Sequence, residues 1–107
     1  MTFAVVYTAE AADDVDEAIN WLLPRMPSAV VDLLQTIRRI EGHLQRNPAI
    51  YRVVRATRLG DIRRVNLRPF RYQLYFQILD SEVVVIACLH ASRSPRAHAR
   101  VISGRRL

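Results

Sequence analysis

Two arginines, a tyrosine and a histidine in the C-terminal half of the chain could together bind a phosphate and move a proton. Arg64 and Arg68 fall on one face of a predicted strand, about 13 Å apart at a rise of roughly 3.3 Å per residue. Tyr75 is expected on the neighbouring strand, and His90 ends the last strand. Arginines can stabilise charge on a phosphate, and a tyrosine or histidine can act as a general acid or base. These four residues are the candidates for a catalytic site.

Each of the four also has a simpler structural interpretation. Arginines on the wet face of a sheet commonly keep that face solvated or bind a protein partner. Tyr75 could pack against the adjacent strand, and His90 could form a structural hydrogen bond at the strand end. The residue types alone leave both interpretations open.

Charge is distributed unevenly along the 107 residues, which suffice for one domain. The chain has 16 arginines and no lysine, against 10 acidic residues, for a net charge of +6. The first 32 residues hold six acids and one arginine, whereas residues 33–107 hold 15 arginines and four acids. A basic surface of this kind attracts polyanions or an acidic protein. The absence of lysine also indicates a codon bias, so part of the arginine content carries no functional meaning.

Several classes of protein and site are not expected. Cys88 is the single cysteine, so no internal disulfide can form, which is typical of a reducing cytoplasm. The N-terminus lacks the pattern of a signal peptide, and no apolar stretch is long enough to span a membrane. His43, His90 and His98 form no recognisable metal-binding set, and no glycine-rich phosphate loop is present. We therefore expect a cytoplasmic protein with neither a metal nor a cofactor.

The elements that must position the candidate residues follow from hydrophobic periodicity. The sequence predicts a strand, two helices, four strands and a basic tail with one or two helical turns: 3–7, 9–23, 29–46, 51–58, 62–68, 72–79, 83–89 and 92–107. The apolar stripe of the helical hairpin needs a sheet to pack on, which predicts a two-layer α+β domain. The acidic side chains of the first helix are expected to be solvated: Asp13, Asp14, Asp16 and Glu17.

Strand alternation then assigns the faces of the sheet. The core row contains Val65, Leu67, Tyr72, Leu74, Phe76 and Ile78. The wet row contains Arg64, Asn66, Arg68, Gln73, Tyr75 and Gln77. In the last strand, Val83, Val85, Ala87 and Leu89 should alternate strictly with Val84, Ile86, Cys88 and His90. That strand is apolar on both sides, as expected at the centre of a sheet.

Two stretches in this order, "LRPFRYQLYFQI" and "VIACLHASRSP", resemble the RelE/ParE superfamily of toxins from bacterial type II toxin–antitoxin modules. The resemblance covers about residues 3–96. It implies a single toxin domain over 1–107, with a helical hairpin on a curved antiparallel sheet. It also implies a growth-inhibiting toxin in a hetero-oligomer with a ParD-like antitoxin, whose segments cover the hairpin and part of the sheet.

The superfamily has two branches with different chemistry. RelE-like members cut messenger RNA on the ribosome, whereas ParE-like members poison DNA gyrase through contacts that include the C-terminal region. RelE-like nucleases often carry a tyrosine or histidine near the C-terminus, and here His98 is the only late candidate. The long hairpin and "FRYQLYF" favour the ParE-like branch. The alternatives are an mRNA endoribonuclease, a non-toxic remnant that binds an antitoxin, and a nucleic-acid-binding module.

The resemblance also suggests which residues contact the partners. The arginines of the tail are expected to contact the target, gyrase or the ribosome: Arg93, Arg96, Arg100, Arg105 and Arg106. The antitoxin is expected to contact Trp21, Arg64, Arg68 and Tyr75.

Overall fold

The computed structural model describes residues 2–107. Its elements are β1 (Ala4–Tyr7), α1 (Ala9–Leu22), α2 (Pro27–Arg46), the 3-10 helix η1 (Pro48–Ile50), β2 (Arg52–Arg55), β3 (Ile62–Asn66), β4 (Tyr72–Leu79), β5 (Glu82–His90) and α3 (Pro95–Arg105). The predicted α+β class and the order of a strand, two helices and four strands are confirmed. No helix within the described residues is both long and apolar enough to cross a membrane.

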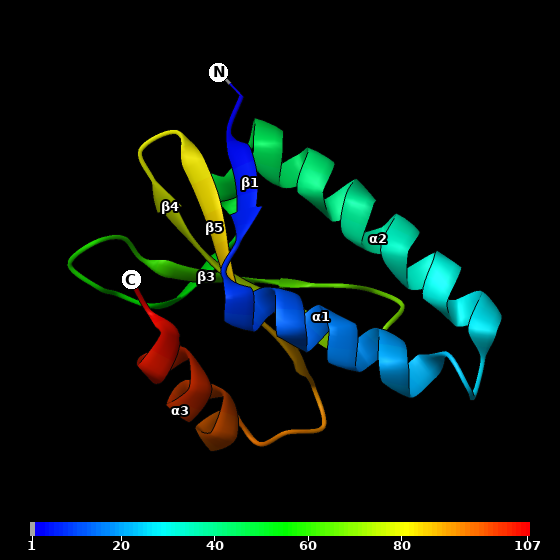
Figure 1. Cartoon of the computed structure of the whole chain (residues 1–107). Coiled ribbons are helices and arrows are strands. Elements are labelled where there is room, and N and C mark those ends of the chain that lie inside the picture. Colours follow the sequence, from blue (N-terminus) through cyan, green and yellow to red (C-terminus); the bar gives the residue numbers. More distant parts are fainter. Residues whose placement is uncertain (1) are drawn as a thin grey trace.

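The five strands form one sheet in the order β1-β5-β4-β3-β2 (Figure 1). Neighbouring strands from β2 to β5 are antiparallel, but β1 runs parallel to β5, so the sheet is mixed. The helical hairpin supplies the crossover that a parallel pair needs. Strand β5 lies between β1 and β4 and is buried along most of its length, as predicted for the central strand.

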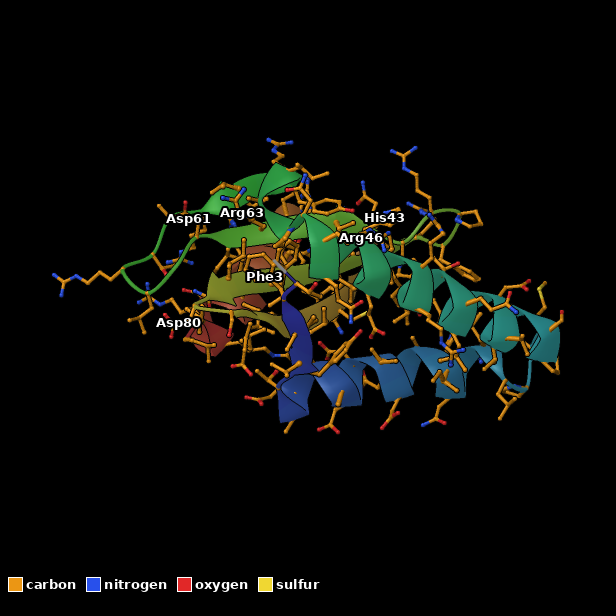
Figure 2. All side chains as sticks on the ribbon, turned by 90° about the horizontal axis from the view of Figure 1, so that it is seen from above. Phe3, His43, Arg46, Asp61, Arg63 and Asp80 are labelled. Carbon is orange, nitrogen blue, oxygen red and sulfur yellow. The ribbon has the colours of Figure 1, made fainter. Side chains whose placement is uncertain are left out.

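Helices α1 and α2 lie antiparallel on one face of the sheet, with Phe3 close to the C-terminal end of α2 (Figure 2). The Thr8 hydroxyl caps α1 by accepting a hydrogen bond from the Ala11 amide at 3.1 Å. Proline in the first turn starts α2 at Pro27, two residues earlier than predicted. Buried residues of the hairpin and sheet form the first core cluster, which includes Ala11, Ala18, Leu33, Ile37, Ile40, Leu44, Leu74 and Phe76.

Helix α3 covers the opposite face of the sheet, where one or two helical turns and open solvent were expected. The helix has 11 residues, and the Ser94 hydroxyl caps it by accepting from the Ala97 amide at 3.1 Å. Ile102 of α3 is buried in a second core cluster with Ile62, Tyr75, Val84, Ile86, Ala87 and Leu89. The sheet therefore lies between two helical layers, and the prediction of two layers was wrong for the part beneath α3.

Part of the predicted wet row is buried, because α3 covers Tyr75 and because the loop at Gly60 and the residue Leu107 contact Gln77. Tyr75 is 2% exposed and Gln77 is 0% exposed. The Gln77 amide is fully engaged, because it donates to the Gly60 carbonyl at 2.7 Å and its oxygen accepts from the Leu107 amide at 2.9 Å. These two residues belong to the interior, and the prediction that they face solvent was wrong.

A β-bulge changes the alternation of β5. Tyr75 pairs with Ala87 and Phe76 pairs with Val85, so Ile86 is an extra residue on β5. Beyond the bulge the faces exchange: Cys88 joins the hairpin-side cluster, whereas Ala87 and Leu89 join the cluster beneath α3. The predicted strict alternation of the last strand was therefore wrong after Ile86.

Candidate functional site

Arg64 and Tyr75 lie on the neighbouring strands β3 and β4, as the sequence predicted, and the register places them directly opposite each other. The Tyr75 hydroxyl lies 2.6 Å from Nδ1 of His98 on α3. Nε2 of His98 lies 2.9 Å from the carbonyl oxygen of His90. A carbonyl only accepts, so Nε2 carries a proton, and in the neutral ring Nδ1 accepts from the Tyr75 hydroxyl, which also lies 3.3 Å from Oε1 of Gln73.

His90 lies on the other face of the sheet, which the bulge explains. Its ring packs edge-on against Tyr72 with centroids 4.9 Å apart, and its Nδ1 accepts from the Ser92 amide at 3.0 Å. The prediction that His90 joins Arg64 and Tyr75 in one site was wrong. The histidine beside Tyr75 is His98.

Arg68 also departs from its predicted position. Strand β3 ends at Asn66, so Arg68 lies in the β3–β4 loop and not on the strand face of Arg64. Its carbonyl oxygen is 3.5 Å from a guanidinium nitrogen of Arg39 on α2. The four catalytic candidates are therefore spread over two faces and a loop, and the predicted constellation is not assembled.

The Asp14 carboxylate joins three parts of the chain and is not a solvated helix residue as predicted. It forms an ion pair with Arg105 of α3 and accepts from the Cys88 backbone amide at 2.9 Å. The hydrogen bonds to Asp14 raise the pKa of Arg105. The guanidinium also donates to the Ile86 carbonyl at 3.3 Å. Arg105 therefore anchors the C-terminal helix, unlike the four other tail arginines.

Those four arginines lie on α3 or directly beside its ends: Arg93, Arg96, Arg100 and Arg106. All four are exposed. Arg96, Arg100 and Arg106 belong to the segment of α3, which covers the face of the sheet opposite the hairpin, whereas Arg93 also lines a cavity beside α1. Their contact with a target stays a prediction.

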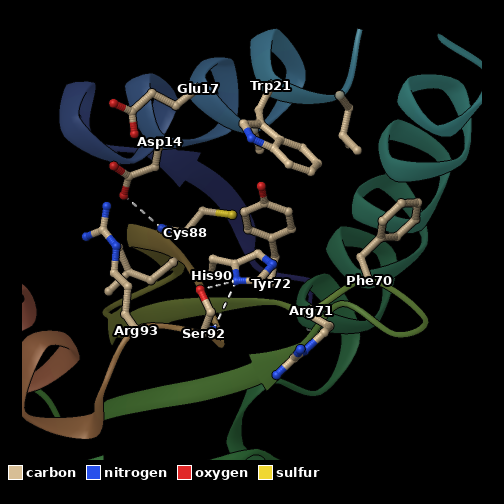
Figure 3. A pocket seen from close by; sticks show the side chains of 13 residues that line it. Asp14, Glu17, Trp21, Phe70, Arg71, Tyr72, Cys88, His90, Ser92 and Arg93 are labelled. Atoms are coloured by element: carbon tan, nitrogen blue, oxygen red, sulfur yellow. Dashed lines mark hydrogen bonds between the residues drawn. The ribbon is translucent and has the colours of Figure 1, made fainter. Parts of the chain in front are cut away.

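A second candidate surface lies between α1 and the ends of β4 and β5 (Figure 3). It encloses about 610 Å³ and is lined by the side chains of Trp21, Phe70, Tyr72 and His90, among others. Trp21 is 56% exposed, which is unusual for so large an apolar side chain. Carboxylates of α1 line one side of this cavity, and Arg71 and Arg93 also line it, so its walls carry both signs of charge.

Burial makes the proton-bearing groups of this cavity poor acids. It raises the pKa of Cys88 to about 12 and also raises the pKa of Tyr72. A neutral thiol is a weak nucleophile and a weak metal ligand. Within residues 2–107, no group of three or more His, Cys, Asp and Glu side chains could hold a metal ion. The Cys88 thiol is therefore a poor nucleophile in this cavity.

The model of one protein family, described as the ParE toxin of the type II toxin–antitoxin system parDE, matches residues 5–95. The chain belongs to the ParE toxin family. It is therefore a toxin of a type II toxin–antitoxin system within the RelE/ParE superfamily. A comparison with curated protein sequences gave no match.

Solved structures share the fold of this ParE-family toxin. A chain of the chromosomal ParDE system of P. aeruginosa is 16% identical with a TM-score of 0.68, covering 85% of this chain and 98% of that one. A chain of the archaeal RelE–RelB complex of Pyrococcus horikoshii OT3 is 14% identical with a TM-score of 0.62, and the match covers 88% of this chain and 100% of that one. A mutant of the E. coli toxin RelE in the free state is 14% identical with a TM-score of 0.62, and the match covers 97% of this chain and 98% of that one.

Two residues at the sites of this toxin were missed by sequence reasoning. Asp14 looked like one of several helix-surface acids, and its partner Arg105 is 91 residues away. Arg52 was assigned to a strand but not to a site, although it lies directly opposite Arg64. His98 and Ile102 are four residues apart in the tail, and this helical spacing was the available signal that one face of a helix is buried there.

Proposed function

We propose that this toxin inhibits growth by acting on DNA gyrase and that a ParD-like antitoxin neutralises it. The observation that carries this proposal is the dispersal of the four residues expected of a nuclease. Tyr75 is buried against His98, His90 lies on the opposite face, and Arg68 lies in a loop. The match to the ParE toxin model supports the same branch.

Buried hydrogen bonds argue against messenger-RNA cleavage by Tyr75 or His98. The Tyr75 hydroxyl donates to His98, and both nitrogens of that ring are engaged within the protein. A general acid or base must reach the proton that it moves, and His98 is only 6% exposed. Inhibition through protein contacts does not need either group to be free.

The exposed arginines of α3 are the residues that we expect to contact gyrase. They can be tested by replacing Arg96, Arg100 and Arg106 with glutamine. The matched control replaces Arg38, Arg46 and Arg58 with glutamine. These three arginines are exposed elsewhere on the molecule, and their replacement removes the same charge. In a supercoiling assay, wild type and control should inhibit gyrase and the α3 variant should be at least about tenfold weaker, the effect of losing roughly 1.4 kcal/mol of binding.

A translation assay run in parallel separates the two branches. Purified toxin is added to translating ribosomes, and the messenger RNA is mapped for cuts. Intact RNA together with inhibited gyrase supports the proposal. Cleaved RNA together with fully active gyrase overturns it and favours the RelE-like alternative.

An antitoxin segment is proposed to cover the hairpin side of the sheet. Five large apolar side chains near the α1–α2 turn are at least 44% exposed: Trp21, Leu23, Met26, Val31 and Leu34. Such a patch is typical of a surface that another protein covers. Co-expression with the neighbouring reading frame should give a complex that Trp21→Ala weakens. Arg64→Glu with Arg68→Glu tests whether the antitoxin also reaches the arginine face, and an unchanged complex would restrict it to the hairpin.

A further inference from the structure

A groove between the sheet and α3 carries three arginines. It encloses about 420 Å³, and Arg52, Arg64 and Arg93 line it together with Gln73, Tyr75 and His98. No carboxylate is among the lining residues. Within residues 2–107, no ion pair or side-chain hydrogen bond engages these three guanidinium groups. Arg52 and Arg64 therefore bring two positive charges to the groove that no lining carboxylate neutralises, and Arg93 adds a third from a position that it shares with the cavity beside Asp14 and Glu17.

The placement of two of these charges is unfavourable in the isolated protein. Arg52 and Arg64 are direct partners in the β2–β3 register. Side chains directly opposite in an antiparallel pair have Cβ atoms about 5 Å apart, and like charges there are destabilising. An anion placed between them would remove the repulsion. The arrangement is that of a binding site for negative charge.

The rest of the groove also suits an anion. The N-terminus of α3 opens onto it at Pro95, so the positive end of the helix dipole adds to the arginine charges. Arg52, Arg64 and Tyr75 form a row across β2, β3 and β4, with strands about 4.8 Å apart. Arginine is well suited to phosphate because its planar guanidinium donates two parallel hydrogen bonds.

From these observations we infer that the Arg52–Arg64–Arg93 groove binds the phosphodiester backbone of a nucleic acid without cutting it. Binding requires only the arginines. Cleavage would need a proton-transfer group open to the ligand, and both Tyr75 and His98 are held in buried hydrogen bonds. The inference is independent of gyrase as a target, because the test uses the toxin and nucleic acid alone.

The test is fluorescence anisotropy with a labelled 20-base-pair DNA duplex at salt concentrations from about 50 to 200 mM. The groove variant replaces Arg52, Arg64 and Arg93 with glutamine. The matched control replaces Arg38, Arg46 and Arg58 with glutamine. These arginines line none of the grooves described above, and their replacement removes the same total charge. Thermal unfolding of each variant shows that it is folded before its binding is measured.

Each arginine that contacts a phosphate contributes about 0.9 to the slope of log affinity against log salt on duplex DNA. The groove variant should therefore lose up to about 2.7 of the wild-type slope. The control should keep most of that slope, and a triple lysine variant of the groove should restore it. In the absence of nucleic acid, Arg52→Gln should raise the melting temperature, because it removes the repulsion with Arg64.

Two results would overturn the inference: no binding by the wild type at about 50 mM salt, or equal loss of slope in the groove and control variants. The second result would mean that net charge alone attracts the nucleic acid. A parallel arm with single-stranded RNA identifies the source of the phosphates. A smaller salt slope of the groove variant with either polymer supports binding in the groove, and the polymer with the larger decrease is the preferred ligand.

Discussion

The Tyr75 hydroxyl lies 2.6 Å from Nδ1 of His98, and this hydrogen bond joins the central sheet to the C-terminal helix. The two residues are 23 positions apart and both are buried. The aromatic rings also pack edge to face, with centroids 5.7 Å apart. The pair therefore fixes α3 against β4 by both polar and apolar contact.

Replacing Tyr75 with phenylalanine should destabilise the fold by about 1–3 kcal/mol, because Nδ1 of His98 would be buried without its donor. Urea denaturation measures the change. The exposed neighbour Arg96→Ala is the control and should stay within about 0.5 kcal/mol of wild type. A double-mutant cycle with His98→Ala should give a coupling energy of at least about 0.5 kcal/mol. Simple additivity would show that the hydrogen bond does not hold α3.

Asp14→Ala should be more damaging than Arg105→Ala. Asp14 accepts from both Arg105 and the Cys88 amide, so its loss removes the ion pair and also leaves a backbone donor unpaired. Removing a charged hydrogen-bond partner costs about 1.5–3 kcal/mol, and an unpaired buried amide adds about 1 kcal/mol or more. Denaturation of both variants checks the ranking, with the exposed Asp13→Ala as a neutral control. The reverse order would contradict the assigned role of Asp14.

Replacement by alanine should change the stability of the protein in opposite directions at two glycines. Gly60 has a φ of 145°, and an added Cβ would lie 3.0 Å from the Ile78 carbonyl oxygen. Gly60→Ala should therefore destabilise the protein by about 1–3 kcal/mol. Gly104 lies within α3 with nothing within 4 Å of an added Cβ, so Gly104→Ala should stabilise by about 0.5–1 kcal/mol. Melting temperatures of the two variants should move in opposite directions.

Stability should fall in alkaline solution because burial raises the pKa of Cys88 from 9.0 to about 12. Above pH 9 the unfolded thiol loses its proton while the folded one keeps it. The folded state then binds more protons, so the free energy of unfolding decreases with pH by up to about 1.4 kcal/mol per unit for this group. The contribution is fully present below pH 9 and is lost as the pH approaches 12.

Denaturation under reducing conditions at several pH values between 8 and 11 measures this dependence. Cys88→Ala should show a shallower fall than wild type. The remaining fall is expected from Tyr7, whose pKa is raised first by burial and then by its hydrogen bond to Glu41, and from Tyr72, whose pKa is also raised by burial. Equal pH dependence in wild type and Cys88→Ala would contradict the contribution of the thiol.

The sequence was sufficient for features that depend on local periodicity. The apolar row at Tyr72, Leu74, Phe76 and Ile78 packs against the hairpin as predicted. The order of elements was also correct, because strong helical and alternating patterns mark each segment. The length of α3 was not predicted, since its buried face needs only a few apolar residues such as Ile102 within an arginine-rich tail.

The candidate site was predicted less well because it depends on contacts between distant segments. The bulge at Ile86 leaves no mark in an apolar strand, yet it moves His90 to the other face. Tyr75 looked solvent-facing because the helix that buries it was not foreseen. Arg64 and Tyr75 were correctly placed on neighbouring strands, since this relationship depends only on local strand patterns joined by a short loop.

The parallel pairing of β1 with β5 has a consequence for how the toxin is made. Val5 pairs with Val83, so the first strand has no sheet neighbour in the described chain until residues near 83 have been synthesised. Contacts that join the two ends of a chain form late and slowly. A nascent chain that has not reached these residues therefore lacks the β1–β5 edge of the sheet, although β2, β3 and β4 can already pair.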